Sequence, residues 1–190
     1  MKVSREHMAG NRRGILEAAG RLFRERGFDA VSVAEVMKAA GLTHGGFYGH
    51  FDSKDDLIVH ALSHAIESRK GTAPDFGAFM DAYLSPQHRD NAAGGCPIAG
   101  LVADTLRQTP EARSAVTNGV RSQIDWISRN LTRLNETDQR RQAIATCAAM
   151  VGATILARAT ADTALSDEIL RETRAWIDEA LGPAAAVGGK

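Results

Sequence analysis

Apolar residues recur every three to four positions along most of the chain, with charged residues between them, which predicts a series of amphipathic helices. In the segment 12–26 the apolar positions Ile15, Ala19 and Phe23 follow this spacing. Gly27 comes directly after them and is a typical helix C-terminal stop. The first predicted helix therefore ends at residue 26.

Three further helix starts follow closely in the sequence. Ser32 and Glu35 have the spacing of a capping box, which predicts a helix of about two turns ending at Gly41. Thr43 is predicted to cap a third short helix, and Ser53 to cap a fourth and longer one. Two short helices joined by a glycine-containing turn and followed by a longer helix are the helix-turn-helix pattern.

The same periodicity continues to the end of the chain. Helices are predicted over residues 76–84, from Pro97, from Pro110 to about residue 134, from Asp138 to about Ala161, and from Ile169 to Leu181 with Ser166 as N-cap. Between them, residues 71–75 are predicted to form a break and residues 85–95 an exposed connection. The fold class is therefore predicted to be all-α.

Composition supports this fold class and limits the function. The 190 residues are 44% apolar, with few aromatic residues and only five prolines, which favours helices over sheet. The formal net charge is zero, so attraction to nucleic acid requires a local excess of charge. Residues 1–26 hold seven basic and three acidic side chains. Both a nucleic-acid-binding arm and a solvated helix face fit this excess.

The two cysteines, Cys96 and Cys147, match no zinc or redox spacing. No apolar segment long enough to span a bilayer is evident, and the N-terminus lacks the apolar core of a signal peptide. These features predict a cytoplasmic protein with reduced thiols and no membrane partner.

The segment Gly41 to Leu57, GLTHGGFYGHFDSKDDL, carries residue types suited to the DNA major groove. Gly45 and Gly46 remove bulk from the start of the third predicted helix, and Thr43 and His44 can reach base edges or phosphates. Other polar side chains of the segment suit phosphate oxygens, whereas Phe47 and Phe51 are predicted to face the core.

The sequence from Val31 to Leu57, VSVAEVMKAAGLTHGGFYGHFDSKDDL, resembles the DNA-binding signature of the TetR family of transcriptional regulators. This resemblance implies a three-helix, helix-turn-helix DNA-binding domain over residues 1–52. It also implies a larger helical ligand-binding and dimerisation domain over residues 53–182. Residues 183–190, after the stop at Gly182, are predicted from their sequence to form a flexible tail. The mechanism implied is that of a homodimeric repressor, which a small-molecule effector releases from a palindromic DNA operator.

The resemblance also assigns residues to these roles. It places Thr43, His44, Gly45 and Gly46 at or near bases, and Ser32, Tyr48, His50 and Lys54 at phosphates. The expected effector-binding residues are Phe79, Met80, Tyr83, Cys96, Leu101 and Trp126, although such apolar stripes are also typical of core packing. The expected dimer interface lies on the last two helices and includes Val151, Ile155, Trp176 and Ile177. No cofactor and no metal are expected.

Three alternatives compete with this interpretation. Cys96 stands at a predicted helix N-terminus, where a thiolate is stabilised, so the regulator can instead be a sensor of oxidants or electrophiles. The chain can also be a DNA-binding dimer without effector control. An enzyme is the third alternative, but no paired nucleophile and base or phosphate-binding loop is apparent. His60 and His64 are one helical turn apart without a third ligand, which favours a solvated helix face over a metal site.

Overall fold

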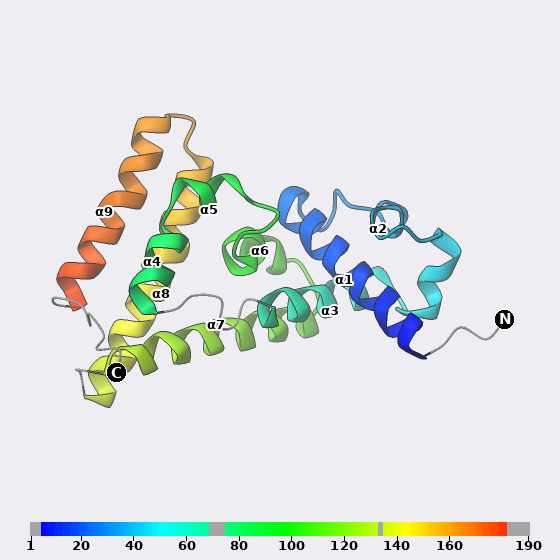
Figure 1. The fold of residues 1–190 in the computed structure, drawn as a ribbon, viewed down its shortest axis with the longest axis horizontal. Helices are drawn as coiled ribbons and strands as arrows, with labels where there is room; N and C mark the ends of the chain where they lie inside the picture. Colours follow the sequence, from blue (N-terminus) through cyan, green and yellow to red (C-terminus); the bar gives the residue numbers. More distant parts are fainter. Residues whose placement is uncertain (1–4, 69–74, 133–134, 182–190) are drawn as a thin grey trace. The chain divides into compact units, whose positions relative to one another are not determined.

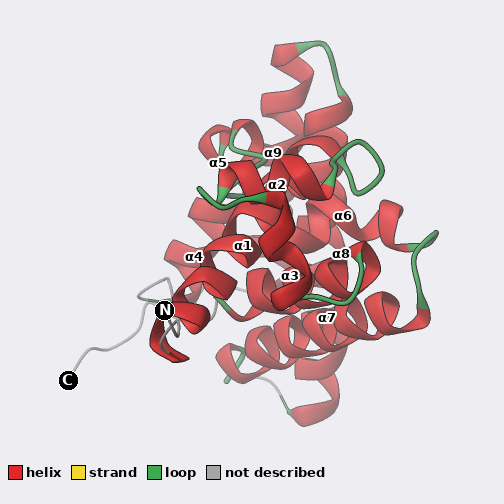
Figure 2. Ribbon diagram, turned by 90° about the vertical axis from the view of Figure 1, so that its right-hand side faces the viewer, coloured by secondary structure: helices red, strands yellow, loops and turns green. Residues whose placement is uncertain are grey.

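Helices are the regular elements of the chain in this computed structural model, which describes residues 5–68, 75–132 and 135–181 (Figure 2). Their bounds are α1 (Arg5–Arg26), α2 (Val33–Ala39), the 3₁₀ helix η1 (His44–Gly49), α3 (Lys54–Glu67), α4 (Phe76–Tyr83), α5 (Pro86–Asp90), α6 (Pro97–Thr105), α7 (Pro110–Asn130), α8 (Glu136–Ala159) and α9 (Thr163–Leu181). No strand occurs in these ranges, and the all-α prediction is confirmed.

The helices form two compact units, and each unit is built from two separate stretches of the chain. The first unit comprises residues 1–70 and 92–119, and so holds α1, α2, η1, α3, α6 and the beginning of α7. The second comprises residues 71–91 and 120–190, with α4, α5, the remainder of α7, α8 and α9. The compact units therefore do not separate at residue 52, and the functional division predicted there stays a prediction.

The core of the first unit lies between α1, α2 and α3 (Figure 1). Ile15 and Leu57 are fully buried there, and the rings of Phe23 and Phe28 meet edge to face with centroids 5.2 Å apart. Gly20 lies where α1 approaches α3 closely, since an added Cβ would come within 3.8 Å of Cβ of Ala65. The predicted apolar face of the first helix is thus the face that packs.

Helix α6 joins this core although it lies far along the chain. Arg24 of α1 donates from Nε to the carbonyl of Ala93, and a Cβ added to Gly100 would lie 3.5 Å from Cγ of Arg24. Gly27 ends α1 with φ of 78°, and an added Cβ there would lie 2.7 Å from a carboxylate oxygen of Asp104. The predicted stop at Gly27 is therefore confirmed and is also a point of close packing.

In the second unit α8 packs along α9 (Figure 1). A network of side-chain hydrogen bonds joins α5 to both helices. Arg158 donates from Nε to the carbonyl of Arg89 and from Nη2 to that of His88, both at 3.0 Å. Ser166 Oγ donates to the carbonyl of Ala157 at 2.7 Å and accepts from Arg89. These bonds give the buried Ser166 hydroxyl and the half-buried Arg89 and Arg158 side chains hydrogen-bond partners.

The prediction that Ser166 caps the last helix is wrong. Helix α9 begins at Thr163, because the carboxylate of Asp162 accepts the backbone amides of Ala164 at 2.8 Å and Leu165 at 3.2 Å. Ser166 therefore lies inside the helix and is 2% exposed. Aspartate and serine are both good N-cap residues, so the local sequence did not show that Asp162 and not Ser166 caps the helix.

The predicted exposed connection over residues 85–95 is wrong in its first half. Ser85 caps the short helix α5 by accepting the amide of His88 at 3.1 Å, and the His88 side chain is buried.

Helix α8 begins at Glu136, two residues before the predicted start, since the Asn135 side chain accepts the amide of Asp138. Of the predicted break at residues 71–75, only Asp75, the N-cap of α4, is described. Leu134 and the predicted tail 183–190 lie outside the described residues.

Candidate nucleic-acid interface

The second and third helical elements have the connection expected of a helix-turn-helix. Ser32 and Glu35 form the complete capping box at the start of α2, as predicted. Gly41 follows α2 with φ of 72°, a left-handed conformation that favours glycine, and the amide of Leu42 donates to the carbonyl of Met37 at 2.9 Å. The predicted stop at Gly41 is confirmed.

The third element is a 3₁₀ helix, and Thr43 is its N-cap residue, as predicted, although the expected capping bond to the Thr43 side chain is absent. The Thr43 hydroxyl accepts no capping bond, whereas its backbone carbonyl accepts the amide of Gly46 at 3.0 Å. Three of the six residues in η1 are glycines, which have low α-helical propensity, so the shorter i to i+3 bonds of a 3₁₀ turn are tolerated here. Ser53 caps α3 through the amide of Asp56, as predicted.

Two phenylalanines hold η1 to the core of the first unit. Phe47 is 1% and Phe51 2% exposed, and their rings stack with centroids 5.7 Å apart. Tyr48, which lies between Phe47 and Gly49, points outward and is 71% exposed. The predicted division of the aromatic residues into core and surface positions is therefore confirmed.

The outward side of η1 is formed by the residues predicted to contact DNA. Thr43, His44, Gly45, Gly46 and Tyr48 are exposed, and His50 is half-buried at the end of the element. Burial and, to a lesser extent, the charge of Arg12 lower the pKa of His50. The lower pKa favours the neutral imidazole, so the His50 side chain is better suited to a hydrogen bond with phosphate than to an ion pair.

The glycines at the two ends of η1 are not required by packing within the protein. A Cβ added to Gly45 or to Gly49 would have no heavy atom within 4 Å, and a Cβ on Gly46 would touch only Met37 and Thr43, at 3.7 and 3.9 Å. None of these three glycines has a positive φ. Their absence of side chains leaves the backbone of η1 bare toward the outside.

Ser32 and Lys54 flank η1, and their surroundings differ. The Ser32 hydroxyl donates to Oε2 of Glu35 at 2.8 Å and accepts the Glu35 amide at 3.2 Å. Hydrogen bonds from Ser32 and Arg26 lower the pKa of Glu35 to about 2, with that from the Ser32 backbone the largest cause. In the DNA-free protein the Ser32 hydroxyl proton is thus directed to a carboxylate. Lys54 opens α3 and is half-buried.

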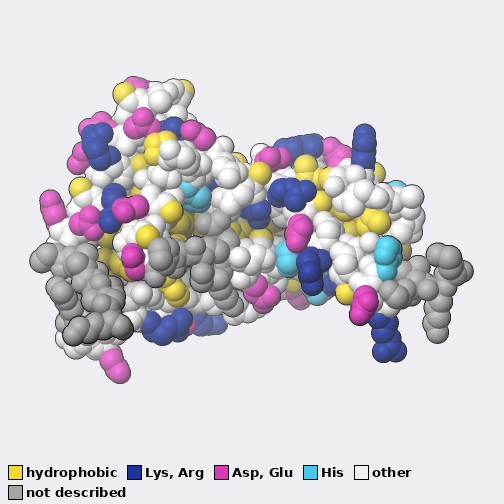
Figure 3. Space-filling view, viewed as in Figure 1, with side chains coloured by type: hydrophobic (Ala, Val, Ile, Leu, Met, Phe, Trp, Pro, Cys, Tyr) yellow, Lys and Arg dark blue, Asp and Glu magenta, His cyan; other side chains and the backbone are white. Residues whose placement is uncertain are grey.

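Arg12 of α1 is a contact of η1 that the sequence did not indicate. Its Nη1 donates to the carbonyl of His50, and its guanidinium carbon lies 4.2 Å from the centroid of the Phe51 ring. On the face drawn in Figure 3, the Lys and Arg side chains around α1 to α3 lie at separate places among acidic and apolar ones and do not form one patch. The basic excess predicted near the N-terminus therefore includes a side chain that is already engaged.

The predicted effector residues divide between the two units. Phe79, Tyr83 and Trp126 come together in the second unit, with ring centroids 4.6 Å apart for Phe79 and Trp126 and 5.7 Å apart for Phe79 and Tyr83. Met80 lies on the same helix and is buried. Cys96, the N-cap residue of α6, and Leu101 within α6 are, in contrast, buried residues of the first unit.

Two further features of the second unit were not predicted. Gln123 stands one turn before Trp126 on α7, and its Nε2 is buried without a hydrogen-bond partner among the described residues. An open, polar cavity of about 230 Å³ lies beside α5 and between the ends of α8 and α9, lined by Arg89, Asp90, Ala157, Arg158, Thr160, Thr163 and Ser166. Arg89 in this cavity is paired with Asp90 and Asp167, so the positive charge of its guanidinium is largely balanced.

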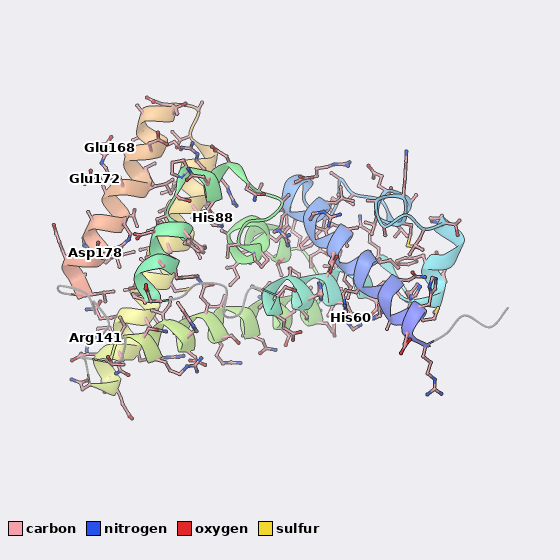
Figure 4. All side chains as sticks on the ribbon, viewed as in Figure 1. His60, His88, Arg141, Glu168, Glu172 and Asp178 are labelled. Atoms are coloured by element: carbon pink, nitrogen blue, oxygen red, sulfur yellow. The ribbon has the colours of Figure 1, made fainter. Side chains whose placement is uncertain are left out.

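The residues predicted for the dimer interface differ in exposure. Ile155 is 37% and Trp176 51% exposed, and Val151 is half-buried. Ile177 is only 1% exposed, so its side chain belongs to the core of the protomer and is not available at the surface. Glu168, Glu172 and Asp178 extend from the outer side of α9 (Figure 4). This helix thus presents acidic and apolar side chains together.

The surroundings of the cysteines and histidines bear on the alternatives. Cys96 and Cys147 are buried thiols and form no disulfide. His60 (Figure 4) pairs with Asp56 at 3.3 Å, and no group of three potential metal ligands occurs in the described ranges. Helix α8 has the length and composition to cross a membrane, contrary to the prediction, but a buried helix of a soluble protein passes the same test.

Sequence profiles of known families match both parts of the chain. The profile "Bacterial regulatory proteins, tetR family" matches residues 15–61, and "Transcriptional regulator LmrA/YxaF-like, C-terminal domain" matches residues 73–172. The HTH-type transcriptional repressor Rv1474c of Mycobacterium tuberculosis is 35% identical over 105 residues, or 52% of this chain and 54% of the relative. TtgR, an HTH-type transcriptional regulator of Pseudomonas putida, is 36% identical over 68 residues, which are 36% of this chain and 32% of TtgR.

Solved structures share the fold over most of their length. The reduced form of Escherichia coli NemR aligns with a TM-score of 0.72 and 22% identity, covering 89% of this chain and 95% of NemR. A TetR regulator of Chloroflexus aurantiacus aligns with a TM-score of 0.73 and 24% identity, covering 90% and 97%. Rv1474c and TtgR, in contrast, are matched over about half of their length or less. The two profiles together show that the chain belongs to the TetR family of bacterial regulatory proteins, which are DNA-binding transcriptional regulators and not enzymes.

Proposed function

We propose that the protein is a homodimeric repressor that acts in the cytoplasm, binds a roughly palindromic operator through η1, and leaves it when a small molecule binds the C-terminal part. The observation that carries the proposal is the bare outward side of η1, where a Cβ added to Gly45 or Gly49 would have no heavy atom within 4 Å. A helix whose backbone is exposed in this way can approach the floor of the major groove closely. The repressor role is supported by the name of the relative Rv1474c.

In this proposal the predicted DNA contacts have distinct tasks. His44, at the exposed start of η1, reads base edges, whereas Tyr48 and Lys54 bind phosphates. With three glycines in η1, few side chains reach the bases, so DNA shape contributes a larger part of the specificity. Ser32 contributes a phosphate contact only if its hydroxyl turns away from Glu35.

The surface of α8 supports the proposed dimer. Residues 142–157 contain no charged side chain, and Ile144, Ala148, Val151 and Ile155 share one side of the helix, with Ile144 46% exposed. Gly152 is open beside this row, since an added Cβ would have no atom within 4 Å. An exposed apolar surface of this kind is typical of an interface. Trp176 of α9 is the aromatic residue expected at its margin.

Gln123 and the aromatic cluster support an effector site in the second unit. A buried amide without a partner costs free energy, so an acceptor group on a ligand would stabilise it. The neighbouring rings of Phe79 and Trp126 suit an apolar or aromatic part of the same ligand. The expected effector is therefore a small, mainly apolar molecule with at least one hydrogen-bond acceptor.

The test is binding to the intergenic DNA beside the protein's own gene, measured by fluorescence anisotropy over a salt series and against an unrelated duplex of equal length. We expect preference for the intergenic duplex and a steep loss of affinity with salt, about one unit of logarithmic slope for each phosphate contact. His44→Ala should reduce the preference between the two duplexes. Equal binding of both duplexes by the wild-type protein would contradict the proposal.

The effector part has its own test. Small apolar molecules with an acceptor group are screened for dissociation of the DNA complex, and each active compound is tested again with Gln123→Leu. We expect the compound to release wild-type protein and to act more weakly on the variant. If no compound releases the DNA, the alternative of a DNA-binding dimer without effector control is favoured. A Cys96-based sensor is less well supported, because Cys96 is 3% exposed and a reactive thiol requires access.

A further inference from the structure

Arg12 and Arg13 are adjacent basic residues of α1 with different surroundings. The Arg13 side chain is exposed, whereas Arg12 is half-buried and lies against the end of η1. Both belong to the basic excess near the N-terminus, which predicts phosphate contacts for either one. Their different exposure indicates that the two arginines have different roles.

Two contacts hold the Arg12 guanidinium in place. Its Nη1 donates to the backbone carbonyl of His50, the residue that ends η1. Its central carbon lies 4.2 Å from the centroid of the Phe51 ring, and Phe51 is 2% exposed and stacked on Phe47. The guanidinium therefore joins α1 both to the backbone end of η1 and to the aromatic side chain that anchors it.

The chemistry of these contacts requires arginine. The last carbonyls of a short helix have no partner inside the helix, so a donor from another element stabilises them. A planar guanidinium can lie on an aromatic ring and still direct an N–H to a carbonyl at its edge, which the ammonium group of lysine cannot reproduce. A lysine at position 12 would keep the charge and lose this combination.

We propose that Arg12 is a positioning residue for DNA recognition, which fixes the C-terminal end of η1 on α1 and does not itself bind phosphate. The inference rests on the proposed function, in which η1 reads the operator. Base readout depends on the placement of η1, whereas non-specific binding depends on the number of phosphate contacts. Loss of the Arg12 contacts therefore weakens operator binding selectively.

The experiment compares Arg12→Lys and Arg12→Gln with Arg13→Lys and Arg13→Gln. Affinities for the intergenic duplex and for an unrelated duplex are measured over a salt series, at a temperature where circular dichroism shows each variant folded. Both Arg12 variants should lose about tenfold in affinity for the intergenic duplex, the size expected for a hydrogen bond to a charged group. Their affinity for the unrelated duplex and its salt dependence should match the wild type.

Two further measurements make the test independent of any one variant. Phe51→Leu removes the ring and leaves the charge of Arg12, and should show the same selective loss. In DNA-free protein labelled with ¹⁵N, the amide signals of Gly49 and Phe51 should shift in Arg12→Lys and stay unchanged in Arg13→Lys. The inference is overturned if Arg12→Lys binds like the wild type and Arg12→Gln weakens binding to both duplexes, with a salt slope lower by about one.

Failure of the proposed function gives a different result. In that case the wild-type protein itself does not discriminate between the two duplexes, whatever the Arg12 variants do. The amide signals still decide the placement of η1, because they are measured without DNA. Unchanged Gly49 and Phe51 signals in Arg12→Lys would overturn the inference on their own.

Discussion

Substitution of Gly45 by alanine separates the demands of folding from those of DNA binding. In the free protein the new methyl group would have no heavy atom within 4 Å, and Gly45 does not have a positive φ. Replacing a glycine by alanine under such conditions stabilises a protein by about 0.4–1 kcal/mol, through the lower entropy of the unfolded chain. For a chain of this length the midpoint of thermal unfolding should rise by about 1–4 °C.

The same methyl group should weaken DNA binding. If the backbone at Gly45 lies against the base edges, an added Cβ occupies space that the duplex fills, and overpacking of this kind costs about 1–3 kcal/mol. The affinity for the operator should then fall about 5- to 160-fold. Fluorescence anisotropy with the intergenic duplex measures the affinity, and circular dichroism measures the unfolding midpoint of the same samples.

Gly14→Ala is the matched control, because Gly14 lies in α1 and an added Cβ there also has no atom within 4 Å. It should raise the unfolding midpoint similarly and leave the operator affinity within about twofold. If Gly45→Ala is stable and binds the operator as tightly as the wild type, the backbone of η1 does not approach DNA closely. The reasoning from its bare surface would then be refuted.

Three other predictions follow from the structure. The folded-state pKa of Glu35 is about 2, below its ordinary value of 4.5. The ionised Glu35 therefore stabilises the folded protein fully above pH about 4.5, and this stabilisation is lost as pH falls toward 2. The difference in urea unfolding midpoint between wild type and Glu35→Gln should narrow over this pH interval, whereas the difference between wild type and the exposed-site variant Glu25→Gln should stay small throughout. Gly41 has φ of 72° and open space for a Cβ. Gly41→Ala should therefore lower the free energy of unfolding by about 1–2 kcal/mol, and Gly41→Asn should lower it by less, since asparagine tolerates this conformation. Equal losses of unfolding free energy for the two variants in urea titrations would contradict a purely conformational cause. Ile155→Glu should convert the proposed dimer to monomer in sedimentation velocity, whereas Leu106→Glu, at a side chain 70% exposed in the first unit, should leave the dimer intact. A dimer in both variants would contradict a place for Ile155 in the interface.

The sequence predicts the first unit well where the determining interactions are local. The caps at Ser32 and Ser53 and the stops at Gly27 and Gly41 depend on residues at most a few positions apart, so spacing alone identifies them. The 3₁₀ geometry after Thr43 was missed because N-cap preference and glycine content point to different structures there.

Contacts between distant residues were not predictable in the same way. Arg12 and the carbonyl of His50 are 38 positions apart, and nothing in their local sequences distinguishes Arg12 from Arg13. Trp176 and Ile177 are neighbours in one helix, and both are apolar, yet one is half exposed and the other buried. Periodicity finds apolar positions, but only tertiary packing determines which of them face the protein's own core.

The first unit is interrupted in sequence, and this has a consequence for synthesis on the ribosome. Residues 92–119, including α6, belong to this unit, yet they follow η1 by more than 40 positions. At a translation rate of about 5–20 residues per second, several seconds therefore pass between the synthesis of η1 and that of the last residues of its unit, and the unit cannot finish folding before then. For the same reason a fragment ending at residue 70 should not fold as a DNA-binding module, because its core would lack α6.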